Sequence, residues 1–288
     1  MSRVLRIDGV EVHHLDADGP VTAVLAFGVG VADEQVSTLG ISHVIEQLAL
    51  DGAEGLESDV AGETRMSYTS MSVQGTPERV VSRLAAICER IADISAGGVH
   101  AGELRRTCRI LQTEGGTAMG DSAHLAEHLN VRLGAQGWGL GAVTAQFLAK
   151  VTPQEVAEWA ADRFTADNAV LALHGPMPEG LRLPLPRGPR CTPAGLDFLA
   201  QTYPAEYLSG GEEPSLSFVI EAPDATSIAA VVLLSSALRA RAYRILRQEW
   251  GVVYGLEVEV VEAGGVAVLA VIVRCAEKEA ADSMKGVL

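Results

Sequence analysis

The most informative stretch of the sequence is Gly40-Ile41-Ser42-His43-Val44-Ile45-Glu46-Gln47-Leu48. Its apolar residues recur at helical spacing, and His43, Glu46 and Gln47 stand at positions i, i+3 and i+4. Residues at these spacings share one face of an α-helix, so the three side chains can converge on one point. An imidazole can bind zinc there and a carboxylate can polarise a bound water, whereas a neutral carboxamide is a poor zinc ligand.

The segments around this helix form a recognisable layout. An apolar strand ends at Gly28-Val29-Gly30, a polar connection leads to the helix, and Asp51-Gly52 follows it. This layout resembles the insulinase/pitrilysin peptidases, which carry the inverted zinc motif H-x-x-E-H. The resemblance covers most of residues 4–281 but depends on three short segments. It implies that His43 is a zinc ligand and Glu46 the general base, with Gln47 in place of the second histidine.

The third zinc ligand of that family is a glutamate on a downstream helix. The segment from Arg106 to Glu114 resembles this helix, which makes Glu114 the counterpart, although an ordinary solvated acid at a helix end fits the same pattern. Zinc held only by His43 and Glu114 would be bound weakly and could not reliably activate a water. We therefore expect a vestigial metal site at His43, Gln47 and Glu114, and a degenerate base at Glu46.

A second segment of the resemblance lies in the C-terminal part of the chain. Arg247 is followed seven residues later by Tyr254, across the turn residue Gly251. In the family, such a pair contacts substrate at a catalytic site built from two halves. The resemblance implies that Arg247 binds substrate carbonyls and that Tyr254 helps to stabilise the oxyanion. Local packing of a helix arginine and a strand tyrosine is the alternative.

A literal H-x-x-E-H sequence also occurs, at His124-Leu125-Ala126-Glu127-His128. The spacing of His124 and His128 suits zinc, but the strand and glycines that precede the family's motif are missing. The simpler interpretation is a half-exposed helix with two surface histidines, and a zinc site here is the alternative.

Composition limits the classes of function. The chain has 288 residues, 48% of them hydrophobic and 20% charged, with a net charge of −15. This acidity argues against nucleic-acid binding, which needs clustered lysine and arginine.

No apolar run approaches the length of a membrane span, and no signal peptide or paired cysteines are evident. We therefore expect a soluble cytoplasmic protein. Lysine occurs only at positions 150, 278 and 285, an arginine bias associated with bacteria of high genomic GC content.

Periodicity and capping signals predict an α+β fold. The resemblance implies two similar domains, each an antiparallel-rich sheet packed with helices. Thr76-Pro77 and the capping box Thr152-Pro153-Gln154-Glu155 begin two helices. Strands are expected at residues 4–13, 21–30, 63–74 and 168–174, with further helices at about 102–114 and 121–133. The second half is expected to contain apolar runs at 216–221 and 228–234, a helix at 237–250, a hairpin of 252–260 with 266–273, and a helix beginning at 278.

Half of the twelve prolines lie between Pro176 and Pro193, which predicts an extended linker. The expected organisation is an N-terminal domain at residues 1–175, a linker at 176–212 and an incomplete C-terminal domain at 213–288.

The resemblance implies a non-catalytic or impaired subunit of an insulinase-type zinc peptidase that acts on peptides. Some bacterial members divide the two chemical halves between paired chains. This chain would supply Arg247 and Tyr254 to a homologous partner that holds the zinc, and would contain no cofactor itself. The alternatives are an active zinc endopeptidase with an atypical ligand set and a peptide-binding scaffold with no shared active site.

Overall fold

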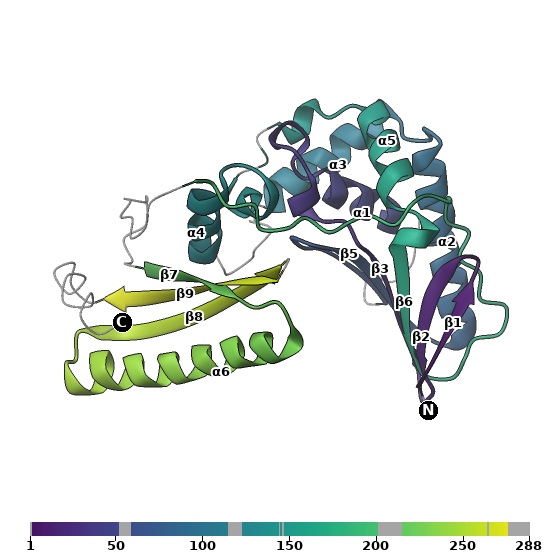
Figure 1. Cartoon of the computed structure of the whole chain (residues 1–288). Helices are drawn as coiled ribbons and strands as arrows, with labels where there is room; N and C mark the ends of the chain where they lie inside the picture. The colour runs from purple at the N-terminus through teal and green to yellow at the C-terminus, as the bar shows by residue number, and fades with distance from the viewer. Residues whose placement is uncertain are drawn as a thin grey trace. The chain divides into compact units, whose positions relative to one another are not determined.

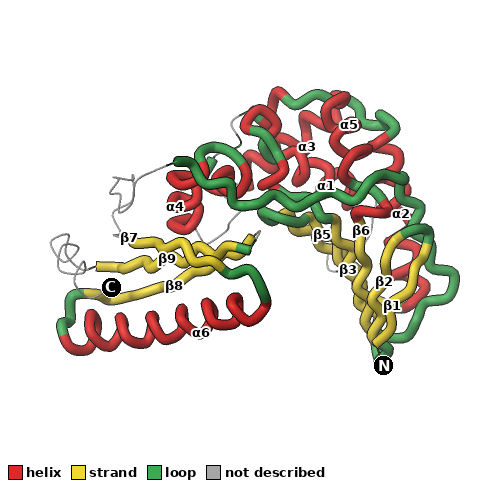
Figure 2. The backbone as a smooth tube through the Cα atoms, viewed as in Figure 1, coloured by secondary structure: helices red, strands yellow, loops and turns green. Residues whose placement is uncertain are grey.

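The structure is a computed structural model, and it describes residues 2–51, 59–114, 123–143, 145, 147–200, 215–263 and 265–275. The helix predicted from residue 278 lies outside the described residues. The chain forms two compact units, and the first combines Met1–Ala118 with Val143–Pro193. The second combines Met119–Ala142 with Ala194–Leu288. Figures 1 and 2 show sheet and helix in both units, which confirms the predicted α+β class.

The first unit is built on a six-stranded sheet of order β1-β2-β6-β3-β5-β4. β2 and β6 pair in parallel, and every other neighbouring pair is antiparallel. Alternate residues of β3 are buried, as expected for a strand with one face against the core. The strands are β1 (Ser2–Ile7), β2 (Val10–Leu15), β3 (Val21–Phe27), β4 (Val60–Thr64), β5 (Thr69–Gly75) and β6 (Ala169–His174).

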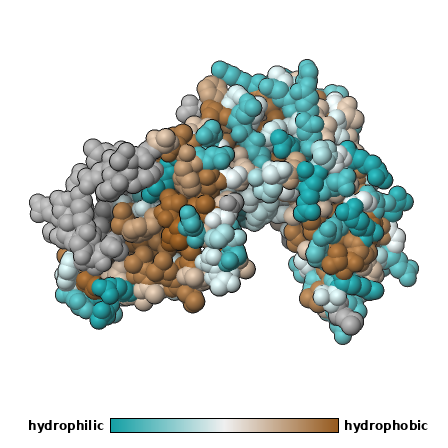
Figure 3. All heavy atoms as spheres, viewed as in Figure 1, coloured by the Kyte–Doolittle hydropathy of each residue, from teal (hydrophilic) through white to brown (hydrophobic). Residues whose placement is uncertain are grey.

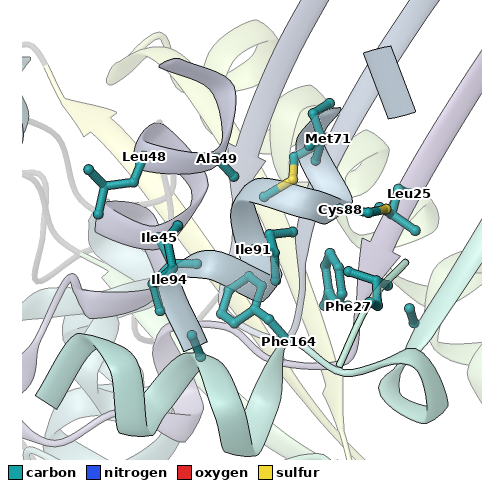
Figure 4. Packing of buried hydrophobic residues seen from close by; sticks show 14 of the residues in the cluster. Leu25, Phe27, Ile45, Leu48, Ala49, Met71, Cys88, Ile91, Ile94 and Phe164 are labelled. Atoms are coloured by element: carbon teal, nitrogen blue, oxygen red, sulfur yellow. The ribbon is translucent and has the colours of Figure 1, made fainter. Parts of the chain in front are cut away.

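Helices lie on one face of this sheet (Figure 1). They are α1 (Ile41–Asp51), α2 (Pro77–Ser95), α3 (Ala101–Glu114) and α5 (Pro153–Arg163). Thr76 caps α2 and the Thr152–Glu155 capping box begins α5, both as predicted. Figure 4 shows the core between helices and sheet, where the rings of Phe27 and Phe164 are 4.9 Å apart between centroids. Burial of these apolar side chains is the main force that holds the unit together.

The second unit has a three-stranded antiparallel sheet of order β7-β9-β8. Its strands are β7 (Ser215–Glu221), β8 (Val253–Ala263) and β9 (Val266–Cys275). The long helix α6 (Ala225–Ala242), capped by Asp224, contacts β8 and β9 and continues into a π-helical segment, Tyr243–Glu249. Helix α4 (Ala123–Leu133) also contacts β9. Residues 267–273 of β9 are buried without interruption because both faces of this central strand are covered.

Three expected elements differ in the structure. Residues 4–13 form two strands rather than one, because Asp8 and Gly9 both have positive φ and close a two-residue hairpin. Residues 63–74 likewise divide between β4 and β5. The run at 228–234 lies inside α6 rather than forming a short buried segment, and Leu233 is 71% exposed.

The units do not follow the expected boundaries. Residues 119–142, expected in the N-terminal domain, belong to the second unit, where α4 packs on β9. The proline-rich stretch is extended, but its first part is no free linker. Leu181, Leu183 and Leu185 are buried in the core of the first unit, and Arg182 Nε donates to Asp8 Oδ2 at 2.8 Å.

One helix among the described residues, Ala225–Glu249, is long and apolar enough by length and composition to cross a membrane. No such segment was expected from the sequence. A single helix of this kind is weak evidence for a membrane span, because helices of soluble proteins pass the same test.

Candidate functional site

The N-terminus of α1 is fixed by Glu34, a buried side chain. Its carboxylate accepts hydrogen bonds from Gly40 N at 2.6 Å and from Ser42 N at 2.9 Å. Trp159 Nε1 on α5 donates to Ser42 Oγ at 3.0 Å. Burial raises the pKa of Glu34, and the backbone hydrogen bonds lower it. The effect of burial is larger, and the pKa is about 7. Glu34 lies in the polar connection before α1, and this role was not predicted, because no periodic or capping pattern relates residues six apart.

The three motif residues lie on α1 as the spacing predicted. His43 Nε2 lies 3.9 Å from Glu46 Oε2, and the His43 side chain is 38% exposed. Gln47 Nε2 lies 3.5 Å from Glu46 Oε1, at the limit of a hydrogen bond. The structure therefore brings His43, Glu46 and Gln47 together on one helix face.

The Glu46 carboxylate points into the protein rather than toward solvent. Its side chain is 1% exposed, and Thr64 Oγ1 on β4 donates a 2.7 Å hydrogen bond to Glu46 Oε2. Gly62, also on β4, leaves the space that the carboxylate fills, since a Cβ there would collide with Glu46. A general base must reach the water that it activates. In this arrangement the carboxylate is used as a packing and hydrogen-bonding group between α1 and β4.

The described motif residues of α1 do not by themselves form a zinc site. Among the described residues, no group of three histidine, cysteine, aspartate or glutamate side chains could hold a metal. Glu114 ends α3, but its side chain lies outside the described residues. Gln47 offers a neutral carboxamide where zinc requires an imidazole, thiolate or carboxylate.

β4 borders the motif helix and forms an edge of the sheet. Within the described part of the chain it pairs only with β5. Asp59 O accepts from Gln74 N and Arg65 N donates to Tyr68 O, so the odd-numbered residues form the hydrogen-bonded pairs with β5. Hydrogen bonding alternates along antiparallel strands, so the backbone groups of Val60, Gly62 and Thr64 are directed at the open edge.

In the second unit, Arg247 and Tyr254 are linked through one turn. Arg247 Nη1 donates to the carbonyl of Val253 at 3.0 Å, and Gly251 between them has φ +68°. Tyr254 follows Val253 directly and is 57% exposed. The structure thus places a guanidinium and an exposed phenol at the start of β8.

The second H-x-x-E-H sequence lies on α4 and has a different environment from the one expected. His128 is 5% exposed rather than a surface residue. Its Nε2 lies 2.8 Å from Ser215 Oγ and its Nδ1 3.0 Å from Ser217 Oγ, while Arg132 Nη2 donates to Ser217 O. Burial, with Arg132 and His124 nearby, lowers the pKa of His128 to about 4. Both ring nitrogens are engaged with β7, so His128 acts as a structural link between helix and sheet.

Comparison with known proteins shows what this architecture is. No protein-family model and no curated protein matches the sequence. Among solved structures, the chain is similar to a peptidase M16 inactive domain from Pseudomonas fluorescens, with 16% identity, a TM-score of 0.70, and coverage of 100% of this chain and 77% of that one. The chain has the M16 peptidase fold.

Two further structures support this assignment. A chain of Complex III2 from Candida albicans is 12% identical, with a TM-score of 0.70 over 96% of this chain and 72% of that one. Pitrilysin is 14% identical, with a TM-score of 0.66 over 98% of this chain. The chain spans only 34% of the length of pitrilysin. Because the three sequence identities are only 12–16%, the likeness establishes the fold and not the activity.

Proposed function

We propose that this chain is a non-catalytic, peptide-binding subunit of an insulinase-type zinc peptidase. It holds an extended peptide along β4 and supplies Arg247 and Tyr254 to a homologous chain that carries the zinc. The observation that carries the proposal is the state of Glu46. The carboxylate that would activate water is buried against Thr64, beside a glutamine in place of a metal ligand.

The fold comparisons support the proposal that this chain lacks catalytic activity. The similar chain from Pseudomonas fluorescens is described as an inactive domain, which shows that the fold occurs without activity in that protein. A chain of a multi-subunit complex is also similar, which supports the proposal that this chain works with a partner.

Peptide binding is supported by the open edge of β4. An edge strand offers unpaired N–H and C=O groups, and an extended peptide can add to them as another strand. The net charge of −15 favours basic peptides among the possible ligands. Because the main chain supplies most of the affinity in this mode, the replaced metal ligand does not prevent binding.

A backbone substitution tests this proposal. Val60→Pro removes an outward N–H from β4 without removing a hydrogen bond to β5, whereas the control Val60→Ala keeps the N–H. With a fluorescently labelled, unstructured basic peptide, we expect Val60→Pro to weaken binding by about tenfold, the equivalent of one lost hydrogen bond to a well-ordered strand. Equal affinity of both variants, at unchanged thermal stability, would overturn binding at this edge.

A further inference from the structure

Helix α6 is apolar on both of its sides. One side packs on the sheet of the second unit through Ile228, Val231 and Leu238. The opposite side is uncovered in the described part of the chain, and Leu233 at its centre is 71% exposed. Figure 3 shows hydrophobic residues gathered over the sheet and α6 of the second unit. A helix that is apolar all round is normally buried on every side, so the exposed side of α6 is expected to contact a partner.

The exposed side has the residue spacing of a helix–helix contact. Successive residues of an α-helix are about 100° apart, so residues three, four or seven positions from Leu233 lie on its side of the helix. These six residues are small and exposed, and with Leu233 they form the outer face of α6: Thr226, Ala229, Ala230, Ser236, Ala237 and Ala240. One large side chain among small ones can fit between the small residues of an identical face, and small residues let two helix axes approach closely.

Opposite charges lie at the two ends of α6. Asp224 caps its N-terminus, whereas the C-terminal part has Arg239, Arg241 and Arg244, with no acidic residue from position 225 to 248. Arg241 is exposed and forms no ion pair with another described residue.

The two charged ends are almost equally far from Leu233. Asp224 stands nine residues before it and Arg241 eight residues after it, or about 14 Å and about 12 Å along the helix axis. Two antiparallel copies of α6 centred on Leu233 therefore place the basic end of each helix beside the acidic end of the other. A parallel pair would instead bring like charges together.

We propose that α6 is a self-association surface, on which a second copy of this chain packs antiparallel about a two-fold axis at Leu233. Such an axis brings one patch against itself, so the patch must be complementary to itself in shape and in charge. The outer face and charged ends of α6 meet both conditions. Burial of the two Leu233 side chains stabilises the dimer, and the charges at the ends fix the direction of the helices. The inference is independent of the proposed function, which concerns β4 and a zinc-bearing chain.

The charges of α6 favour a second copy over a membrane surface. An anionic bilayer would attract the arginines, but it would repel Asp224 and the exposed Glu221 before it, in a chain of net charge −15. A neutral bilayer would contact the apolar residues and leave the arginines without a partner. An antiparallel copy accounts for the apolar face and for both charged ends.

Sedimentation velocity of the full chain at about 1 to 100 µM tests the proposal. We expect the mass to rise with concentration from one chain of 30.2 kDa to two. Leu233→Asp should raise the Kd of the dimer by about 100-fold or more, because the contact would bury two unpaired carboxylates. Val4→Asp is the control, because Val4 is 63% exposed on β1 of the first unit, and it should change the Kd by less than about twofold.

A charge substitution tests the direction of the helices. Arg241→Glu should raise the Kd by about tenfold, because it places like charges together at both ends of the contact. Arg239→Glu makes the same change in net charge about 160° away around the helix, and it should raise the Kd by less than about threefold.

Pairing of introduced thiols tests the position of the axis and does not depend on a destabilising substitution. Leu233→Cys places the two thiols of a dimer together on the axis, so mild oxidation should link the chains. Val232→Cys is the control, because Val232 is 53% exposed but points about 100° away, and its thiols should link at least about tenfold more slowly. Peptide mass spectrometry distinguishes a link between introduced thiols from one that involves a native cysteine.

Three outcomes would overturn the proposal. The first is the mass of a single chain at every concentration. The second is a dimer on which Leu233→Asp and Val4→Asp act equally, or in which the two introduced thiols link at equal rates. The third is a single chain that binds phosphatidylglycerol vesicles and loses this binding in Leu233→Asp, which would assign the outer face to a membrane surface.

Discussion

Thr64 and Glu46 are joined by a 2.7 Å hydrogen bond between the β4 hydroxyl and the α1 carboxylate. The bond connects helix α1 to strand β4 and holds the Glu46 carboxylate in the interior. The bond should stabilise the folded state, because a buried carboxylate that loses a hydrogen-bond donor is left incompletely solvated.

Thr64→Val tests this bond with little change in side-chain shape. We expect it to lower the free energy of unfolding by about 1–3 kcal/mol, because a buried carboxyl group loses a hydrogen-bond partner. Urea denaturation measures the change. Ser72→Ala is the control, because its exposed 3.3 Å bond to Ala61 O should contribute little. Equal effects of the two substitutions would show that the Thr64 bond does not hold Glu46 in place.

Glu34 should give the first unit a distinctive pH dependence. Its pKa is about 7 in the folded chain and 4.5 for an ordinary glutamate, so the folded state binds the proton more tightly. Its contribution is therefore complete below pH 4.5 and is lost as the pH rises through 7, by up to about 3 kcal/mol. Asp33, whose pKa is also raised by burial, acts in the same direction.

Urea denaturation at a series of pH values from about 4.5 to about 8 checks this expectation. The first unit of the wild-type chain should lose stability as the pH rises in this range, whereas the second unit, which contains His128, should not. Glu34→Gln should make the unfolding free energy of the first unit depend less on pH, even though an amide satisfies the two backbone donors less well. A slope unaffected by Glu34→Gln would contradict the assignment.

His128 should give the second unit the opposite response. Its pKa is about 4 in the folded chain and 6.5 for an ordinary histidine, so the neutral ring is favoured by folding. The contribution is complete above pH 6.5 and is lost as the pH falls toward 4, by up to about 3 kcal/mol. Hydrogen exchange of β7 and α4 at about pH 7.5 and about pH 5 measures it, with His128→Gln as the pH-insensitive variant. Equal acid sensitivity of both chains would exclude this role of His128.

Arg247 and Tyr254 are distinguishable by their effects on stability. Arg247→Ala loses the hydrogen bond to Val253 O, so it is expected to destabilise the second unit by about 0.5–1.5 kcal/mol. Tyr254→Phe removes only an exposed hydroxyl and should change stability by less than about 0.5 kcal/mol.

In a complex with a zinc-bearing partner chain, Tyr254→Phe should nevertheless reduce peptide cleavage by about 10–1,000-fold, the range for loss of one oxyanion donor. A reduced rate at unchanged stability supports a shared catalytic site. An unchanged rate would favour a peptide-binding scaffold that contributes no catalytic group.

Local chemistry allowed several elements to be predicted from sequence. The proline and threonine at the start of α2 and the capping box of α5 act within one turn, so their effect does not depend on distant residues. The hairpin of β8 and β9 joins strands that are neighbours in the sequence, and it was also predicted. The face shared by His43, Glu46 and Gln47 followed from helical spacing alone.

Other features depend on tertiary contacts and were not predicted. The short apolar run at 228–234 fits a strand or a helix, and in the structure it lies in α6, which contacts β8 and β9. The assignment of α4 to the second unit depends on its packing against β9 and on the His128 contacts to β7. The burial of Glu46 depends on Gly62, a residue sixteen positions away whose lack of a side chain leaves the space.

We propose that this chain does not itself bind catalytic zinc, and its metal content tests the proposal most directly. Elemental analysis of the full chain, purified without chelators or metal-affinity resin, should give close to zero zinc per chain. Gln47→His, which completes the H-x-x-E-H motif, should raise the zinc content, because it replaces a carboxamide with an imidazole. About one zinc per unsubstituted chain, lost in His43→Ala, would contradict the account.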